Sequence, residues 1–250
     1  MEQMLKGKVA VVTGGTRGIG YAIVKKYLEE GAVTVLCGSR EETALKALDK
    51  IKAEMPGASV DAIWPDLSNR AAVSAEFLRI KEKYGSLDIL ANNAGISQNT
   101  SIFEYKDEDF DKILDLNIKA VYACSRAAAE IMKEQGGGVI INTSSIVSYN
   151  GQGSGCGYPA SKFAVNGLTK SLSRELGRYN IRVNAVAPGV TRTDMVAVLP
   201  DEMIQPIIRN IPLGRMAEVE DIANAFLFLA SDMASYVSGA ILPVAGAVVI

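Results

Sequence analysis

The chain has 250 residues, of which 48% are hydrophobic and 22% charged, and its 26 basic and 28 acidic side chains leave a formal net charge of −2. This size suits one sizeable hydrophobic core, and the balanced charge excludes the basic surface that nucleic acid or an anionic membrane requires. The chain has no histidine. This excludes Ser-His-Asp hydrolysis, Cys-His catalysis and histidine-ligated metal sites, so we expect a perturbed Tyr, Lys, Cys or carboxylate as acid or base, and no metal.

Seven short runs rich in Val and Ile read as β-strands, and they alternate with amphipathic stretches such as 21–30, 41–55 and 221–233. Runs that are apolar throughout indicate a sheet covered on both faces, and the alternation predicts parallel strands with right-handed crossovers. We therefore expect a single α/β domain over residues 1–250, with a doubly wound parallel sheet and helices on both faces. The expected strands are 9–13, 33–37, 59–64, 87–92, 138–143, 181–186 and 239–244.

The segment TGGTRGIG (13–20) follows the first expected strand and opens the first expected helix. Glycines there allow a tight turn and a close approach of the backbone to a pyrophosphate, which the free N–H groups of the helix start can bind. In this context the segment predicts a dinucleotide site on a Rossmann-type sheet, with a plain turn as the alternative. The expected contacts are Gly14, Thr16, Arg17, Gly18, Ile19 and Gly20.

The end of the second expected strand bears on the choice of cofactor. An acid that binds the ribose is expected roughly 20 residues after the glycine turn. The sequence has none there before Glu41, and Ser39 and Arg40 lie where a 2′-phosphate would bind. Arg17 could approach the phosphate from the other side, because a guanidinium matches phosphate geometry. We therefore expect NADP(H), with NAD less favoured; alternatively, Arg40 is only a solvated residue at the start of a helix.

Two Tyr–Lys pairs have the four-residue spacing that places both side chains on one helix face. Tyr21 and Lys25 lie inside the first expected helix with no hydroxyl partner upstream, so we interpret them as packing and solvent-exposed residues. Tyr158 and Lys162 follow Ser145 by 13 and 17 residues, and Ser145 lies at the end of the fifth expected strand. Ligands of open parallel sheets bind beyond the carboxyl ends of the strands. The second pair is therefore the candidate for chemistry.

The glycine spacing G-x-x-x-G-x-G, the motif NNAG (92–95) and the downstream YxxxK together resemble the short-chain dehydrogenase/reductase family over the whole chain. The resemblance implies a nicotinamide dinucleotide cofactor and a catalytic set of four residues. The implied catalytic residues are Asn117, Ser145, Tyr158 and Lys162. The implied further cofactor contacts are Asp66, Leu67, Asn93, Ala94, Gly95, Tyr158, Lys162, Pro188, Gly189, Val190, Thr191 and Thr193.

The chemistry expected of this set centres on the Tyr158 phenol, whose ordinary pKa is about 10. Lys162 and a cationic nicotinamide would lower that pKa; a shift of about 3 units needs roughly 4 kcal/mol. Tyr158 would then donate a proton to a carbonyl oxygen as hydride arrives, while Ser145 hydrogen-bonds the same oxygen. The resemblance also implies that Lys162 binds the nicotinamide ribose and that Asn117 helps to hold a water relay.

Two of the cofactor contacts have a structural alternative. Asp66 could cap the helix that follows it, and Thr193 with Asp194 could cap a helix after a Pro-Gly loop. The substrate loop is expected at roughly 194–212, which is rich in Met, Val, Ile and Pro. Such residues suit an apolar substrate, or they pack the loop itself.

The motifs GYPASK, PGVTRTDM and FLFLASDMAS look like those of bile-acid and other hydroxysteroid dehydrogenases of bacteria. The general layout also resembles 3-oxoacyl-carrier-protein reductases, which bind an acidic carrier through basic residues. Arg174 matches one such position, whereas Glu130 and Ala245 depart from that pattern, and Glu130 would repel an acidic partner. We expect an NADP(H)-dependent enzyme that interconverts an apolar secondary alcohol and a ketone. The acyl reductase is the alternative, and a non-catalytic cofactor-binding regulator is a remote one.

The surroundings of the protein can also be anticipated. No apolar run approaches the roughly 18 residues of a membrane span, and the N-terminal segment is not typical of a signal peptide. Cys37, Cys124 and Cys156 are odd in number and far apart, which favours a reducing cytoplasm over a disulfide framework. The family resemblance implies a homotetramer with helices around 103–133 and 159–178 at one interface and the C-terminal strand at another.

Overall fold

A computed structural model of the chain describes residues 3–193, 205–206 and 208–248, and it contains one sheet of seven strands. All seven expected strands are present, and their ends differ from the expected ones by at most two residues. The strands are β1 Val9–Thr13, β2 Val33–Cys37, β3 Val60–Ile63, β4 Ile89–Asn92, β5 Gly138–Thr143, β6 Ile181–Pro188 and β7 Ile241–Val244.

The strand order is β3-β2-β1-β4-β5-β6-β7, and every neighbouring pair is parallel. The chain runs outward from β1 to β3, returns to β4 beside β1, and then runs outward in the opposite direction to β7. β1 and β4 are buried along their whole lengths, as expected of central strands covered on both faces. The expected doubly wound fold is confirmed, and the switch between β1 and β4 is where such sheets bind ligands.

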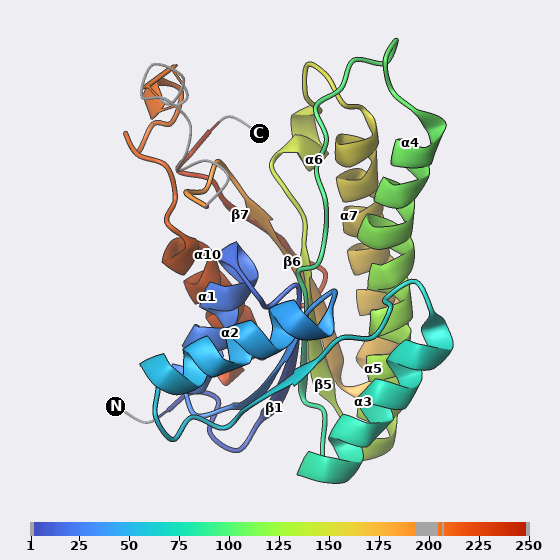
Figure 1. Cartoon of the computed structure of the whole chain (residues 1–250), viewed down its shortest axis with the longest axis vertical. Coiled ribbons are helices and arrows are strands. Elements are labelled where there is room, and N and C mark those ends of the chain that lie inside the picture. Colours follow the sequence, from blue (N-terminus) through green and yellow to red (C-terminus); the bar gives the residue numbers. More distant parts are fainter. Residues whose placement is uncertain (1–2, 194–204, 207, 249–250) are drawn as a thin grey trace.

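Helices cover both faces of the sheet (Figure 1). α1, α2 and α10 lie on one face, where Tyr27 and Phe226 are fully buried in the same cluster of apolar side chains. α3, α5 and α7 lie on the other face, around the fully buried Phe77. The longer helices are α1 Gly18–Glu29, α2 Glu41–Glu54, α3 Arg70–Tyr84, α4 Asp107–Leu114, α5 Ala120–Gln135, α7 Gly157–Leu176 and α10 Val219–Ala230. The shorter helical segments are η1 Asp115–Lys119, α6 Val147–Asn150, η2 Gly177–Tyr179 and η3 Asp232–Ala234.

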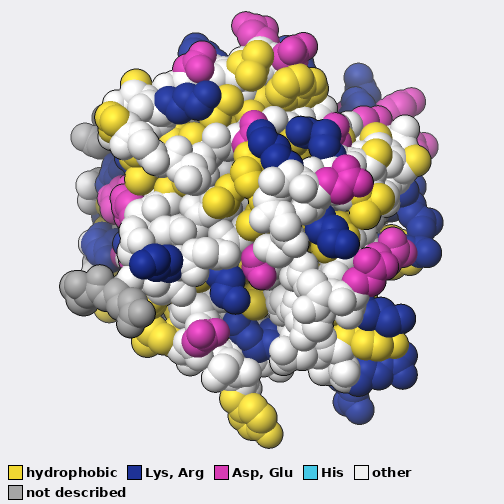
Figure 2. Space-filling model, turned by 90° about the horizontal axis from the view of Figure 1, so that it is seen from below, with side chains coloured by type: hydrophobic (Ala, Val, Ile, Leu, Met, Phe, Trp, Pro, Cys, Tyr) yellow, Lys and Arg dark blue, Asp and Glu magenta, His cyan; other side chains and the backbone are white. Residues whose placement is uncertain are grey.

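The surface has mixed charge, in line with the composition. Figure 2 shows basic and acidic side chains interspersed on the face that it presents, with hydrophobic side chains scattered between them. Within the described part of the chain, no helix is long and apolar enough to cross a membrane. The same residues contain no cluster of three or more Cys, Asp or Glu side chains that could hold a metal ion.

Candidate active site

The glycine turn between β1 and α1 requires glycine for two reasons, its positive φ angles and the crowding at Gly14 and Gly20. Gly14 and Gly18 have φ angles of +65° and +54°, which favour glycine. A Cβ atom on Gly14 would lie 2.9 Å from Ala94 Cα, and one on Gly20 would collide with the Gly14 carbonyl oxygen. α1 begins after Arg17 without a side-chain cap, so its first N–H groups are available to an anion.

Thr13 joins this turn to the NNAG segment that follows β4. Its Oγ1 accepts hydrogen bonds of 3.0 Å from the backbone N–H groups of Asn93 and Ala94. Asn93 Nδ2 donates to the carbonyl oxygens of Thr13 and Gly14, at 3.3 and 3.2 Å. Two segments that are about 80 residues apart in sequence therefore form one loop cluster at the switch point. Thr13 was not among the expected site residues, although its place as the last residue of β1 could have indicated it.

The structure brings Ser145, Tyr158 and Lys162 together at the carboxyl end of β5. Ser145 is buried just beyond the strand, and its hydroxyl faces the Tyr158 phenol closely enough to influence the pKa of that phenol. Lys162 Nζ lies 5.7 Å from the centre of the Tyr158 ring and donates a 2.8 Å hydrogen bond to the carbonyl oxygen of Thr143. The α7 helix supplies both members of the Tyr–Lys pair, so their spacing along one helix face is preserved.

The pKa values within this group differ from the expectation. Burial raises the pKa of Tyr158, and the Ser145 hydroxyl lowers it in part. Burial lowers the pKa of Lys162 from its ordinary 10.5 to about 8. Ser145 therefore offsets part of the rise in the Tyr158 pKa, while the Lys162 ammonium group donates to the Thr143 carbonyl oxygen.

Asn117 lies in η1, a short π-helical turn between α4 and α5, and it is fully buried. Its amide exchanges two 2.9 Å hydrogen bonds with the backbone of Ile96 and donates a third, of 3.0 Å, to Ser161 Oγ. Ser161 Oγ in turn donates to the Tyr158 carbonyl oxygen at 2.7 Å. Asn117 is therefore connected to the helix that carries Tyr158. Ser161 was not expected in the site, and its place between Tyr158 and Lys162 is the only signal for it in the sequence.

The segment that follows β6 reaches back to the glycine turn. A Cβ atom on Gly189 would lie 2.7 Å from Ala245 Cα, and one on Gly18 would lie 3.7 Å from Thr193 Cγ2. Thr191 is buried and its Oγ1 donates to the Gly189 carbonyl oxygen at 3.1 Å. The structure thus places these expected contacts at the carboxyl end of β6. Asp194, the partner of Thr193 in the alternative capping role, lies outside the described residues.

The two cofactor contacts expected after β3 are Asp66 and Leu67, and both lie just beyond the carboxyl end of that strand. Asp66 Oδ1 accepts hydrogen bonds of 2.9 and 2.7 Å from the backbone and hydroxyl of Ser68, which hold the Asp66 pKa below its ordinary value. The alternative that Asp66 caps the next helix is wrong. Asn69 takes that role, since its Oδ1 accepts from two backbone N–H groups in the first turn of α3. Leu67 is half-buried and packs against the apolar cluster under α3.

Ser39 and Arg40 are exposed at the start of α2, beyond the carboxyl end of β2. Arg17 is also exposed, and it lines a cavity beside the glycine turn together with Thr16. Neither Ser39 nor Arg40 lines that cavity.

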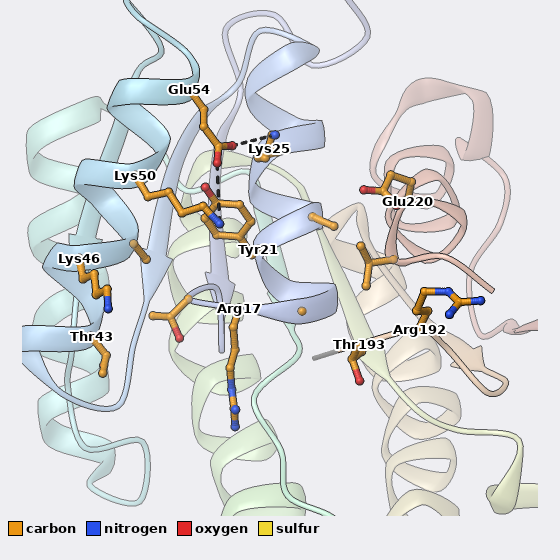
Figure 3. Close-up of a pocket in the computed structure, with 15 residues that line it drawn as sticks. Arg17, Tyr21, Lys25, Thr43, Lys46, Lys50, Glu54, Arg192, Thr193 and Glu220 are labelled. Atoms are coloured by element: carbon orange, nitrogen blue, oxygen red, sulfur yellow. Dashed lines mark hydrogen bonds and ion pairs between the residues drawn. The ribbon is translucent and has the colours of Figure 1, made fainter. Parts of the chain in front are cut away.

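The other Tyr–Lys pair has different surroundings. Figure 3 shows Tyr21, Lys25 and Lys50 gathered around Glu54, on the outer side of α1 and α2. Burial and the nearby Glu54 carboxylate raise the pKa of Tyr21 to about 12. Lys25 Nζ lies 2.8 Å from Glu54 Oε2. The neighbour of Tyr21 is therefore a carboxylate, whereas the neighbour of Tyr158 is the Ser145 hydroxyl.

These residues fit a nicotinamide dinucleotide. The glycine turn lets a pyrophosphate approach the backbone closely, and the uncapped start of α1 offers N–H groups to its charge. Gly95 leaves space next to both Asn117 and Lys162, because a Cβ atom there would lie 3.1 Å from Asn117 Oδ1 and 3.7 Å from Lys162 Nζ. Of the expected substrate loop, residues 194–204 and 207 lie outside the described residues.

Comparison with known proteins places the chain in one family. A family model described as enoyl-(acyl carrier protein) reductase matches residues 14–247. A 3α-hydroxysteroid dehydrogenase of Mediterraneibacter gnavus is 66% identical over 247 residues, which cover 99% of both chains. A 3-oxoacyl-(acyl-carrier-protein) reductase of Thermotoga maritima is 38% identical over 98% of this chain and 99% of its own.

Solved structures agree with the sequence relatives. The crystal structure of gox2181 has a TM-score of 0.93 and 31% identity, and the match covers 98% of this chain and 96% of that chain. A protein described as a short-chain alcohol dehydrogenase of Sinorhizobium meliloti 1021 has a TM-score of 0.91 and 33% identity, with 98% of both chains covered. The chain therefore belongs to the short-chain dehydrogenase/reductase family, whose members are oxidoreductases that use a nicotinamide dinucleotide.

Proposed function

We propose that the protein is an NADP(H)-dependent oxidoreductase that interconverts a secondary alcohol and a ketone on a hydroxysteroid or a similar apolar molecule. The reaction type rests on one observation, the meeting of the Ser145 and Tyr158 hydroxyls beside Lys162 at the carboxyl end of the sheet. The substrate class is supported by the 66% identical relative named 3α-hydroxysteroid dehydrogenase, which aligns over nearly the whole chain.

Four residues carry the proposed chemistry, and the bound cofactor supplies or accepts hydride. Tyr158 gives its phenolic proton to the carbonyl oxygen during reduction and takes the alcohol proton during oxidation. Ser145 donates a hydrogen bond to the same oxygen and stabilises the charge that develops there. Lys162 holds the cofactor ribose with its buried ammonium group. Asn117 holds the Ile96 backbone and the Ser161 hydroxyl in place; the water relay that the family resemblance implies stays a prediction.

The proposed preference for NADP(H) rests on charge. No acid follows β2 before Glu41, so nothing on the β2 end repels a 2′-phosphate as an aspartate would. Arg17 extends from the glycine turn (Figure 3), and its guanidinium matches the geometry of a phosphate.

The assembly is proposed on family grounds. We infer a single cytoplasmic domain over 1–250, which functions as a homotetramer and uses roughly 194–212 as its substrate loop. Tyr122 on α5 and Phe163 on α7 are exposed aromatic side chains on the helices expected at one interface.

Reduction of acyl-carrier-protein thioesters is the second candidate function. Several relatives named 3-oxoacyl-(acyl-carrier-protein) reductase are 37–40% identical to this chain. The surface of α5 is less suited to an acidic carrier. Glu130 is exposed on this helix, and its carboxylate binds the Arg126 guanidinium at 3.0 Å. The pair therefore offers a carrier no free basic group at the position where the reductases have one.

A substrate panel tests the proposal. Steroid ketones, acyl thioesters and small ketones would each be mixed with the enzyme and with NADH or NADPH, and the loss of cofactor absorbance followed. We expect kcat/KM for steroid ketones with NADPH to exceed that for acyl thioesters by about tenfold or more. Preference for the thioester would establish the acyl reductase instead. Binding of cofactor without turnover of any ketone or alcohol would favour a non-catalytic regulator.

A further inference from the structure

The turn that carries Ser145 contains two further serines, Ser144 and Ser148, which are almost completely buried. Buried hydroxyl groups need hydrogen-bond partners, and the proposed reaction uses neither of these two. The turn leads into α6, which has only four residues and is too short to be stable by itself. The position of Ser145 therefore depends on what holds this turn, and α6 packs against α7.

Asn166 on α7 binds both of these buried serines. Its Oδ1 accepts a 2.6 Å hydrogen bond from Ser144 Oγ, and its Nδ2 donates a 2.8 Å hydrogen bond to Ser148 Oγ. Ser148 Oγ donates in turn to the Ser145 carbonyl oxygen at 2.6 Å, and the Ser148 backbone N–H donates to the same oxygen at 3.0 Å. The side chain of Asn166 is thus connected through Ser148 to the backbone of Ser145.

An amide is well suited to this place. A serine hydroxyl has one proton, and that of Ser148 is used on the Ser145 carbonyl, so Ser148 Oγ needs a donor. Ser144 Oγ lies 3.1 Å from Ser148 Oγ and closer to Asn166 Oδ1, so its proton needs an acceptor there. Asparagine supplies one donor and one acceptor at the same time, whereas a carboxylate would only accept and an apolar side chain would do neither.

Asn166 also has a fixed relation to the residues that carry the proposed chemistry. It follows Lys162 by four residues and Tyr158 by eight, so all three side chains lie on one face of α7. The helix that presents the phenol therefore also holds the turn that presents Ser145. A displacement of α7 would move the phenol and this turn together.

Holding the backbone of Ser145 determines where its hydroxyl lies. The Val147 N–H donates to Ser145 Oγ at 3.4 Å, which leaves the Ser145 proton available to a substrate oxygen. The Ile146 N–H donates to the Pro188 carbonyl oxygen at 3.0 Å and connects the same turn to the end of β6. A donor stabilises developing charge only when it already points at the oxygen, and a misplacement of about 1 Å can cost on the order of 10²-fold in rate.

We propose that Asn166 is a positioning residue, which holds the turn formed by residues 144–148 and thereby directs the Ser145 hydroxyl at the reacting oxygen. This proposal rests on the ketone–alcohol reaction proposed above. In this role Asn166 acts through Ser145 and takes no part in the transfer of a proton or hydride.

The first test removes both hydrogen bonds of Asn166 at nearly constant side-chain volume. Asn166→Leu should lower kcat about 10- to 100-fold, with the ketone that the substrate panel identifies and NADPH. The Kd of NADPH, measured by fluorescence, should stay within about twofold because Lys162 is unchanged. Thr169→Val is the matched control, since Thr169 is fully buried on the same helix and bonds Asn142 and Val165 instead of the turn. We expect it to lower the melting temperature and to leave kcat within about twofold.

A double-mutant cycle then separates positioning from general stability. In a Ser145→Ala background the hydroxyl that Asn166 positions is absent, so Asn166→Leu should lower kcat by no more than about a further twofold. Ser148→Ala removes only the last hydrogen bond of the chain, and we expect it to lower kcat in the same direction by a smaller factor. It replaces Asn166→Leu in the cycle if that variant does not fold.

The possible outcomes distinguish this proposal from the one on which it rests. Losses of kcat that multiply in the double variant, or an equal loss in Thr169→Val, would show that Asn166 only stabilises α7 and would overturn its positioning role. Full kcat in Asn166→Leu, or in Ser148→Ala as its replacement, would overturn that role and leave the proposed reaction intact. A wild type that turns over no ketone or alcohol would overturn the proposed function, and this inference with it.

Discussion

The surroundings of Tyr21 and Tyr158 show how little the spacing of a motif determines at the level of a single residue. Each tyrosine precedes a lysine by four positions on a helix. Burial raises the pKa of both phenols, but Tyr21 faces the Glu54 carboxylate, which adds to the rise, whereas Tyr158 faces the Ser145 hydroxyl, which offsets part of it. A phenol beside a carboxylate is a poor proton donor, so the neighbours rather than the spacing separate the two roles.

The first prediction concerns these two phenols. Tyr158→Phe removes the proton donor and should lower kcat by at least about 10³-fold, in the range typical of general acid–base groups. Affinity for the cofactor should stay within about twofold, because the ring remains in place. Tyr21→Phe is the matched control and should keep nearly full kcat. Steady-state rates and fluorescence titration of the cofactor measure both quantities. Similar losses of kcat in the two variants would refute the assignment.

A second prediction follows from the burial of Lys162. Its pKa is about 8 in the folded protein and near 10.5 otherwise. Between these values the unfolded chain binds more protons than the folded one, so the wild type gains stability as pH rises. Relative to Lys162→Met, the wild-type free energy of unfolding should increase by about 1.4 kcal/mol per pH unit in this window. Urea denaturation at several pH values between about 7 and 10 measures this difference.

The same variant should lose both turnover rate and cofactor affinity, because Lys162 lies beside Tyr158 and is proposed to hold the ribose. If the difference in unfolding free energy between the wild type and Lys162→Met stays constant across the pH range, burial does not lower the pKa of Lys162. An unchanged profile of rate against pH would contradict its place in the mechanism.

At the scale of the element, the turn between β1 and α1 combines a backbone requirement with a packing requirement. Gly14 and Gly18 are needed for their positive φ angles, whereas Gly20 is needed because the Gly14 carbonyl and the Asn93 amide occupy the space where a side chain would lie. Similarly, η1 interrupts the long helix formed with α4 and α5, and it is at this interruption that Asn117 enters the site.

The glycine turn provides the third prediction. Gly20→Ala should destabilise the protein by about 3 kcal/mol, the upper range for overpacking, and should weaken cofactor binding as the turn opens. Gly177→Ala is the control. Gly177 has helical φ and ψ angles of −55° and −36° with nothing near its Cβ position, so alanine there should stabilise by up to about 1 kcal/mol. Chemical denaturation compares the two; tolerance of Gly20→Ala would mean that the Gly14–Gly20 contact is readily relieved.

At the scale of the whole molecule, the parallel sheet gathers the site from distant parts of the chain. The glycine turn, the NNAG segment, Ser145 and the loop after Pro188 each follow a strand, and parallel pairing brings all these strand ends to one edge. The same architecture leaves the outer surfaces of α5 and α7 free, and these carry Tyr122 at 41% and Phe163 at 49% exposure.

The fourth prediction is that these surfaces form part of a homotetramer interface. Light scattering on the purified protein should give the mass of four chains. Phe163→Glu should yield smaller species, since a charge would be buried at the interface. Leu78→Glu is the control, because Leu78 is equally exposed, at 48%, but lies on α3 outside the proposed interfaces. A monomeric wild type, or equal loss of mass in both variants, would overturn the proposal.

Several features were accessible from the sequence because they depend on local order. The apolar runs predicted every strand to within two residues. The signal is clearest for inner strands such as β1 and β4, which are covered on both faces. The glycine pattern predicted the turn, since its backbone angles exclude most other residues. The spacing of Ser145, Tyr158 and Lys162 after a strand predicted that they would meet, because parallel strands share one carboxyl edge.

Other features were decided only by the tertiary structure. Asn69 and not Asp66 caps α3, Thr13 and Ser161 connect segments of the site, and Arg40 does not line the cavity beside Arg17. The low pKa of Lys162 likewise comes from burial beneath segments far away in the chain. Each of these depends on which side chains from different elements come within a few ångströms of one another. The sequence determined the elements and their order, whereas the packing of those elements determined the charge, the neighbours and the accessibility of each group in the site.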